Sequence, residues 1–171
     1  MRVVFFAILH TMYSKHILPK LLKWRMDQKR FVTGRQWCVP QAKGIVLEIG
    51  FGAGANLPHY TRDVSKLFAF EPSKELFNTA IDSIQTTFKL SQIVTRAENI
   101  PLAKNSIDSI ICTWTLCSVE NITEVVQELY RVLKPNGKVI FIEHGKSKHP
   151  ALQIFQNLFN NLWRNVQAGV T

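Results

Sequence analysis

The segment from Val46 to Tyr60, with the sequence VLEIGFGAGANLPHY, constrains the fold of this chain more than any other segment does. A short apolar run leads into three glycines at alternate positions, Gly50, Gly52 and Gly54. Glycine adopts backbone conformations that other residues resist, and it lets a ligand approach the main chain closely. A helix that begins just after the loop would add unpaired N–H groups and a partial positive charge. The segment therefore predicts a nucleotide-type pocket at a strand-to-helix junction.

Strand-like and helix-like patterns alternate along the chain, which predicts an α/β fold with a Rossmann-like, doubly wound and mostly parallel sheet. The length of 171 residues suits one domain, expected at residues 44–171 after a basic, apolar N-terminal segment (1–43) that contains a helix. The five expected strands are residues 45–49, 67–70, 92–95, 107–113 and 138–143. The expected helices are 13–32, 76–88, 122–133 and 152–166, with a turn at 134–137 ending the third.

Polar and acidic residues follow the ends of these strands. They are Glu48–Gly54, Glu71, Ala97–Glu98, Thr113–Ser118 and Glu143–His144. Ligands of doubly wound sheets bind beyond the carboxyl ends of the strands. The pattern therefore predicts a single site at one edge of the sheet.

The net charge of +9 is unevenly distributed. Residues 1–43 carry +8, whereas residues 44–143 carry −2, which argues against a nucleic-acid groove through the site. The basic segment fits contact with an anionic membrane surface through residues 1–31. The first nine residues, MRVVFFAIL, are too short to span a bilayer, so they are either a membrane-dipping anchor or sequence upstream of a start at Met12. The helix at 13–32 is either a lid or membrane-surface helix, or a helix packed on the sheet edge.

The three cysteines, Cys38, Cys112 and Cys117, form no CxxC pair and have no histidine cluster at metal spacing. We expect neither a disulfide framework nor a metal site, and we expect a reducing, cytoplasmic location. Cys112 and Cys117 are expected to be small buried apolar residues, and the alternative for Cys117 is a reactive thiol.

The glycine loop alone fits two kinds of cofactor. Gly50-x-Gly52-x-x-Ala55 satisfies the relaxed dinucleotide fingerprint, and Glu71 lies nineteen residues after Gly52, where NAD-binding proteins place a ribose-binding acid. An acid two residues before the first glycine, Glu48, is a further feature that the fingerprint does not explain.

Several motifs taken together resemble one family. These motifs are EIGFGAG, FEPS, AENIP, CTWTLCSV, LKPNGK and FIEHG. They resemble the class I S-adenosylmethionine-dependent methyltransferases of the type 11 group, which includes quinone-biosynthesis enzymes, over roughly residues 13–168. Within that group they look most like the branch that acts on small thiols or lipid-associated substrates. The resemblance implies S-adenosylmethionine as cofactor and methyl transfer to a thiol, lipid or quinone-type small molecule by in-line displacement.

The resemblance also implies which residues bind the cofactor. They are Glu48, Gly50, Gly52, Gly54, Asn56, Glu71, Pro72, Ala97, Glu98 and Thr113. Glu71 is expected to accept hydrogen bonds from both ribose hydroxyls, and the loop backbone to contact the aminocarboxypropyl tail, with the helix N-terminus favouring its carboxylate. Glu48 either faces the cationic sulfonium or accepts hydrogen bonds from the loop backbone, and we favour the second. Arg96 stands where this class often has Asp, which puts an adenine amino contact there in doubt.

The acceptor side of the site is predicted less fully. His144 is the nearest candidate base for a thiol or amine acceptor, and its alternative is a structural role at the strand end. Trp114 and Leu116 form either a wall of the acceptor pocket or part of the core. Methyl transfer depends largely on positioning, so no catalytic triad is required.

The C-terminal region departs from the family pattern. The resemblance implies an antiparallel pair of strands after the fifth strand, and no such pair is evident after residue 143. We therefore expect a C-terminally short domain whose fifth strand is an exposed edge suited to homo-oligomer formation. The alternative functions are a non-catalytic cofactor-binding or membrane-surface protein and, with less support, a nicotinamide-dependent oxidoreductase.

Overall fold

The computed structural model describes residues 28–81, 86–116, 119 and 121–143. Within them a single sheet of five parallel strands has the order β3-β2-β1-β4-β5. The strands are β1 (Gly44–Ile49), β2 (Val64–Phe70), β3 (Lys89–Ile93), β4 (Ile107–Thr113) and β5 (Leu133–Ile142). The chain winds outward from β1 in one direction through β2 and β3, and then in the other through β4 and β5. This confirms the predicted doubly wound α/β fold.

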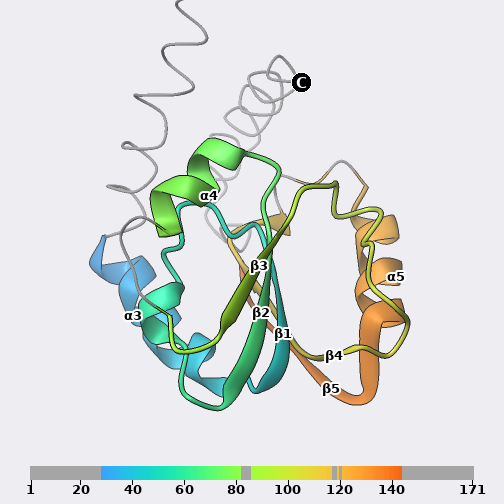
Figure 1. Ribbon diagram of the computed structural model, residues 1–171, viewed down its shortest axis with the longest axis horizontal. Coiled ribbons are helices and arrows are strands. Elements are labelled where there is room, and N and C mark those ends of the chain that lie inside the picture. Colours follow the sequence, from blue (N-terminus) through green and yellow to red (C-terminus); the bar gives the residue numbers. More distant parts are fainter. Residues whose placement is uncertain (1–27, 82–85, 117–118, 120, 144–171) are drawn as a thin grey trace, which may run out of the picture.

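Helices cover both faces of the sheet. They are α3 (Lys29–Cys38), α4 (Lys74–Ile81) and α5 (Ile122–Val132), with single 3-10 turns η2 (Val39–Gln41) and η3 (Leu57–His59). Figure 1 views the sheet along its edge and shows α3 and α4 on one side and α5 on the other. The central strands are consequently buried on both faces, which explains their nearly continuous apolar sequence.

Alternate residues of β1 and β4 supply the two halves of the core. Leu47 and Ile110 pack on the α5 side with Val125 of that helix. Val46 and Ile111 point to the opposite side, into the cluster that contains Phe77 of α4. The period of two along a strand sends neighbours to opposite faces, so each strand contributes to both clusters.

A side-chain cap fixes the start of α5. The Oδ1 atom of Asn121 accepts hydrogen bonds from the backbone N–H groups of Thr123 (3.1 Å) and Glu124 (3.4 Å), and its Nδ2 donates to the Glu124 carboxylate (2.8 Å). Two otherwise unpaired donors of the first turn are thereby satisfied. From this start, Val125, Leu129 and Val132 lie on the buried face.

Two expectations about the connections are wrong. The glycine loop is followed by the short 3-10 turn η3, not by an α-helix, before β2 begins at Val64. Lys134–Gly137 is not a free turn after α5: β5 already pairs at Leu133, and its register against β4 shifts before Lys138. Helix α5 still ends just before this segment, since a proline cannot continue it.

Other boundaries differ by several residues. Helix α4 ends at Ile81, residues 82–85 lie outside the described part, and Phe88 is in a bend. Strand β3 begins earlier than expected, at Lys89. The predicted helix 13–32 is described only from residue 28 onward, and there α3 continues to Cys38. The predicted helix 152–166 lies outside the described residues.

Replacing the cap, Asn121→Ala, should lower the free energy of unfolding by about 1 kcal/mol, because two N–H groups of α5 lose their acceptor. Urea titration followed by circular dichroism measures the change. Thr123→Ala is the matched control in the same exposed turn, and it should stay within about 0.5 kcal/mol of the parent chain. Equal losses in the two variants would show that the cap does not stabilise α5.

Candidate functional site

The glycine loop lies at the carboxyl end of β1, in the centre of the sheet. Gly50, Gly52 and Gly54 all have positive φ angles, of 71°, 56° and 76°. A Cβ atom at Gly50 would overlap the Thr115 side chain, whereas a Cβ at Gly52 would meet no atom within 4 Å. Gly50 therefore allows close packing inside the protein, and Gly52 presents its backbone to open space where a ligand can approach.

Gly54 packs against the neighbouring helix. A Cβ atom there would lie 2.6 Å from the Cβ of Ala80 in α4. The backbone N–H of Gly54 donates to the carbonyl of Phe51 (3.1 Å), which closes the loop on itself. Within the described part of the chain, the N–H groups of Ala53 and Ala55 donate to no other group. The loop thus carries two backbone donors that a ligand acceptor can use.

Glu71 ties the end of β2 to the glycine loop. Its Oε2 accepts from the N–H of Gly52 (2.8 Å), and its Oε1 accepts from the N–H of Ser73 (2.9 Å). The side chain is buried, and burial raises its pKa while the two backbone bonds lower it. Each carboxylate oxygen has further acceptor capacity beyond its one bond, so Glu71 can also accept from a pair of hydroxyls.

Glu48 is fully buried below the loop. Its Oε1 accepts from Nδ2 of Asn56 (2.8 Å), and its Oε2 accepts from the hydroxyl of Tyr60 (2.7 Å). Desolvation raises the pKa of Glu48 to about 8, although both hydrogen bonds and the nearby Arg35 lower it. The expectation that Glu48 accepts from the loop backbone is wrong, since two side chains take its oxygens.

Asn56 connects the loop to two other elements. Its Nδ2 also donates to Oγ1 of Thr113 at the end of β4 (3.0 Å), and its Oδ1 accepts from Nε of Arg35 in α3 (3.0 Å). Asn56 and Thr113 are both buried. These two predicted cofactor residues therefore lie beneath the loop, where they support it.

The end of β5 holds the segment after β4. Oε1 of Glu143 accepts from the N–H groups of Thr115 (2.9 Å) and Leu116 (3.0 Å). Trp114 has a φ of 53° and packs edge-on against Phe31 with ring centroids 4.7 Å apart. Its backbone N–H donates to the carbonyl of Ile142. These contacts make Trp114 part of the packing between α3 and the strand ends.

The remaining predicted residues lie at the same edge of the sheet. Pro72 is exposed directly after β2, Ala97 is buried, and Glu98 accepts from the N–H of Asn121 (3.2 Å). His144 and Cys117 lie outside the described residues. Residues 28–81, 86–116, 119 and 121–143 contain no cluster of three or more histidine, cysteine or acidic side chains able to hold a metal.

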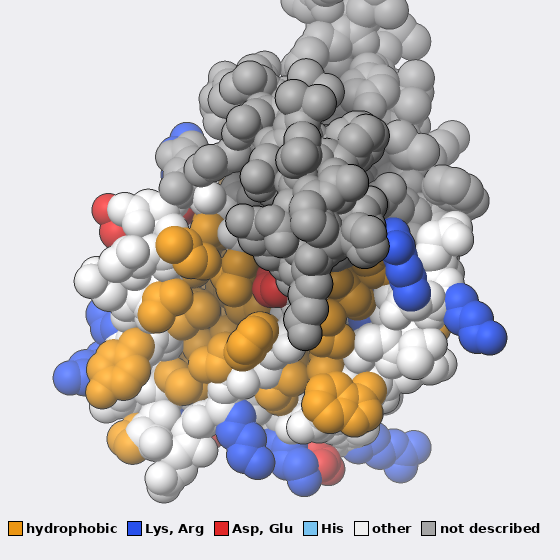
Figure 2. Space-filling model, turned by 180° about the vertical axis from the view of Figure 1, so that it is seen from behind, with side chains coloured by type: hydrophobic (Ala, Val, Ile, Leu, Met, Phe, Trp, Pro, Cys, Tyr) orange, Lys and Arg blue, Asp and Glu red, His pale blue; other side chains and the backbone are white. Residues whose placement is uncertain are grey.

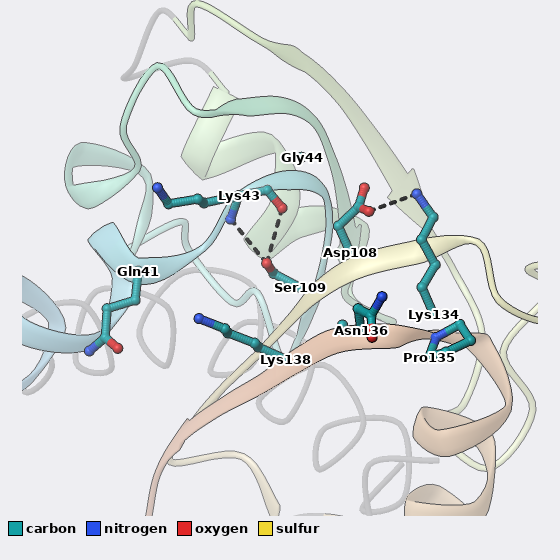
Figure 3. Close-up of a pocket in the computed structure, with 10 residues that line it drawn as sticks. Gln41, Lys43, Gly44, Asp108, Ser109, Lys134, Pro135, Asn136 and Lys138 are labelled. Atoms are coloured by element: carbon teal, nitrogen blue, oxygen red, sulfur yellow. Dashed lines mark hydrogen bonds and ion pairs between the residues drawn. The ribbon is translucent and has the colours of Figure 1, made fainter.

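A separate pocket of about 630 Å³ lies at the opposite, amino-terminal edge of the sheet. Figure 3 shows Asp108 paired with Lys134 (2.7 Å) and Ser109 bonded to both backbone groups of Lys43. The other oxygen of Asp108 accepts from the N–H of Ile45. Asp108 and Ser109 are thus engaged in bonds that hold neighbouring segments together. Parallel sheets bind ligands at the other edge, so we assign this pocket a structural role.

Sequence reasoning missed Arg35 and Tyr60. Arg35 comes from a helix that precedes β1, and its side chain is only 2% exposed. The sequence spacing between Arg35 and Asn56 does not indicate a contact, because this hydrogen bond depends on how α3 packs on the sheet. A buried acid such as Glu48 does require donors, and Asn56 and Tyr60 are among the few polar side chains that follow the loop closely in the sequence.

Residues 47–141 match the methyltransferase domain family. The chain belongs to this family. It is 32% identical over 129 residues to thiol S-methyltransferase TMT1B of Rattus norvegicus and 32% identical over 134 residues to human TMT1A. These matches cover 72% and 75% of the chain and 52% and 54% of the relatives, so the chain spans about half of their length.

Solved structures agree with this fold. The Bacillus subtilis YcgJ protein superposes with a TM-score of 0.59 at 25% identity, over 78% of this chain and 56% of that one. A SAM-dependent methyltransferase from Aquifex aeolicus shares the fold with a TM-score of 0.60 at 22% identity, over 77% and 76% of the two chains.

S-adenosylmethionine is the cofactor that family membership implies, and the loop fits it. Three features lie together at the carboxyl edge of the sheet. They are the open face at Gly52, the N–H groups of Ala53 and Ala55, and the remaining acceptor capacity of Glu71. They offer donors for the carboxylate of the cofactor's amino acid tail and acceptors for its ribose hydroxyls.

Alanine at Gly50 should destabilise the protein more than alanine at Gly52. Both positions require positive φ, at a cost of about 1–2 kcal/mol, but only Gly50 adds an overlap with Thr115, which brings the expected loss to more than about 2 kcal/mol. Chemical denaturation of the two variants measures the difference. Each variant serves as the control for the other, and equal losses would contradict the packing role of Gly50.

Proposed function

We propose that this chain is the cofactor-binding part of a small-molecule methyltransferase whose acceptor is a thiol, or otherwise a lipid or quinone-type molecule. The observation that carries this proposal is the open glycine loop fixed to Glu71. A thiol is favoured because four relatives named thiol S-methyltransferases are 28–36% identical to this chain, against 27% for a quinone-biosynthesis C-methyltransferase.

We assign the cofactor contacts by the chemistry of each group. Glu71 accepts from the ribose hydroxyls while it keeps its two backbone bonds. The backbone of Gly50–Gly54 holds the aminocarboxypropyl tail, with Ala53 and Ala55 donating to its carboxylate. Pro72, Ala97 and Glu98 border the adenine. No helix N-terminus contributes, since η3 is a single 3-10 turn.

The protein's part in the reaction is placement and exclusion of water. When bound, S-adenosylmethionine supplies a methyl group activated by its sulfonium. Placement of the acceptor in line supplies much of the rate. His144 remains our candidate for removing the acceptor proton, from its position directly after Glu143. Glu143 holds Thr115 and Leu116, which places these residues beside that strand end.

The same loop suggests two other functions. A nicotinamide oxidoreductase loses support because the family match covers the same loop that suggested it. A non-catalytic cofactor-binding or membrane-surface protein would retain the glycine loop and Glu71 and transfer no methyl group. Incubation with labelled S-adenosylmethionine and a panel of thiol, phenol and lipid acceptors distinguishes a methyltransferase from this non-catalytic protein. The proposal requires methylation of at least one acceptor class.

Contact with a membrane surface rests on the basic segment at residues 1–31. No helix within the described residues is long and apolar enough to cross a bilayer. We propose that residues 1–31 contact an anionic membrane surface, consistent with the +8 of residues 1–43.

Replacing Glu71 with Ala should weaken binding of S-adenosylhomocysteine by about 1.5–3 kcal/mol, because charge-assisted hydrogen bonds and the anchor of Gly52 are both lost. Isothermal titration calorimetry measures the affinity. The control is Asp63→Ala, which removes an exposed acid that pairs with Lys43 at the amino-terminal edge of the sheet. It should leave the affinity unchanged. An unaltered affinity in Glu71→Ala would remove Glu71 from the cofactor site.

We also propose that β5 pairs with a second copy of the chain. Among the described residues β5 is an edge strand, and an edge pairs readily with an identical edge about a two-fold axis. Val139 and Phe141 are 42% and 63% exposed, and their register places them on the α5 side of the sheet. Figure 2 views the molecule from behind and shows hydrophobic side chains gathered on the side turned to the viewer.

Light scattering tests this pairing. The parent chain should be a dimer, and Phe141→Glu should make it monomeric because a charge would be buried at the interface. Val94→Glu, at an exposed apolar position away from β5, is the control and should leave the dimer intact. A monomeric parent chain, or a dimer unaffected by Phe141→Glu, would overturn the proposal.

A further inference from the structure

Arg35 is a buried cation that comes from outside the family match. It lies in α3, before residue 47 where the match begins, and it is 2% exposed. Burial of a guanidinium is costly unless its donors and its charge are satisfied. Helix α3 packs closely on the strand ends, since a Cβ at Gly34 would lie 3.1 Å from Ile142 and 3.2 Å from Trp114. The site beneath the loop is therefore completed by an element that the family match does not include.

The contact with Asn56 fixes the orientation of an amide. Nε of Arg35 is a donor, so the atom of Asn56 that it meets must be the oxygen. The amide nitrogen then faces Glu48 and Thr113, both of which require a donor. The guanidinium also lies over the Trp114 ring, 5.0 Å from its centroid, which holds the guanidinium in place.

Arg35 also contributes to the electrostatic surroundings of Glu48, alongside desolvation and the hydrogen bonds from Tyr60 and Asn56. The titratable groups that interact with this carboxylate come from several elements packed around it. They are Arg35 and Cys38 of α3, Tyr60 after η3, Glu71 just after β2 and Cys112 of β4. Among these groups Arg35 is the cation, and it favours the ionised form of Glu48. In that form both carboxylate oxygens accept, as the bonds to Asn56 and Tyr60 require.

We propose that Arg35 is a positioning residue for cofactor binding, which acts through Asn56 and Glu48 to hold the glycine loop in its binding conformation. The inference rests on the proposed function, because it presumes that this loop binds S-adenosylmethionine. It adds that α3 is part of the cofactor site. It also adds that the affinity depends on the ionisation of Glu48, which Arg35 favours and which does not itself touch the ligand.

Calorimetric titration with S-adenosylhomocysteine between about pH 6 and 9 tests the proposal. Glu48 has a pKa of about 8, so the affinity of the parent chain should rise as the pH passes through that value and the carboxylate ionises. Arg35→Met removes an influence that lowers this pKa. Its affinity at neutral pH should fall on the order of tenfold, and its midpoint should move to higher pH.

Further variants separate charge from geometry. Arg35→Lys keeps the cation without the planar fork, so the midpoint should stay near that of the parent chain while the affinity falls. Glu48→Gln should abolish the midpoint, which assigns it to this carboxylate. Lys29→Met, at an exposed position of the same helix, should bind like the parent chain. If Arg35→Met does not fold, Arg35→Gln removes the charge while it keeps a donor and gives the same comparison.

The outcomes distinguish this inference from the proposed function. A parent chain that binds no S-adenosylhomocysteine at any pH overturns both. A parent chain that binds while Arg35→Met matches it within twofold overturns the inference alone. Weaker binding by Arg35→Met with an unshifted midpoint also overturns it, because that pattern indicates a packing role only.

Discussion

The buried carboxylate of Glu48 is the constraint on which the architecture of the site depends. A carboxylate away from water must find donors, and it finds them in Asn56 and Tyr60, which lie on the far side of the glycine loop. Those two bonds pull the loop back over the end of β1. Asn56 then extends the connection to β4 through Thr113 and to α3 through Arg35. One buried acid thus brings three elements together beneath the surface that meets the ligand.

A second acid, Glu71, holds the glycine loop from the side that faces open space. Glu71 accepts from Gly52 and Ser73, so it joins the end of β2 to the loop on the side that remains open. Its lower degree of burial leaves it able to accept from a ligand as well. The two acids have different roles because of their surroundings: Glu48 is enclosed by protein donors, and Glu71 lies beside open space at Gly52.

Much of the fold was predictable because its signals are local. The strand at 107–113 was placed at its observed bounds, since a continuous apolar run between turn residues has few alternatives. The helix α5 was predicted within one residue of its observed end, since its apolar spacing and the following proline both mark it. The helix expected after the glycine loop was wrong, because Asn56 and Tyr60 turn toward Glu48 and the chain has too few residues left before β2. The early start of β5 was missed because pairing with β4 overrides the turn propensity of Lys134–Gly137.

The sequence by itself determined the order of elements, the position of the glycine loop and the edge of the sheet at which polar residues gather. These follow from periodicity, from glycine at fixed positions and from the rule that parallel strands end together. Only the tertiary structure decided what each acid does and that Arg35 takes part. Hydrogen-bond partners and burial depend on distances between residues far apart in the chain, such as Arg35 and Asn56, and no local pattern encodes those distances.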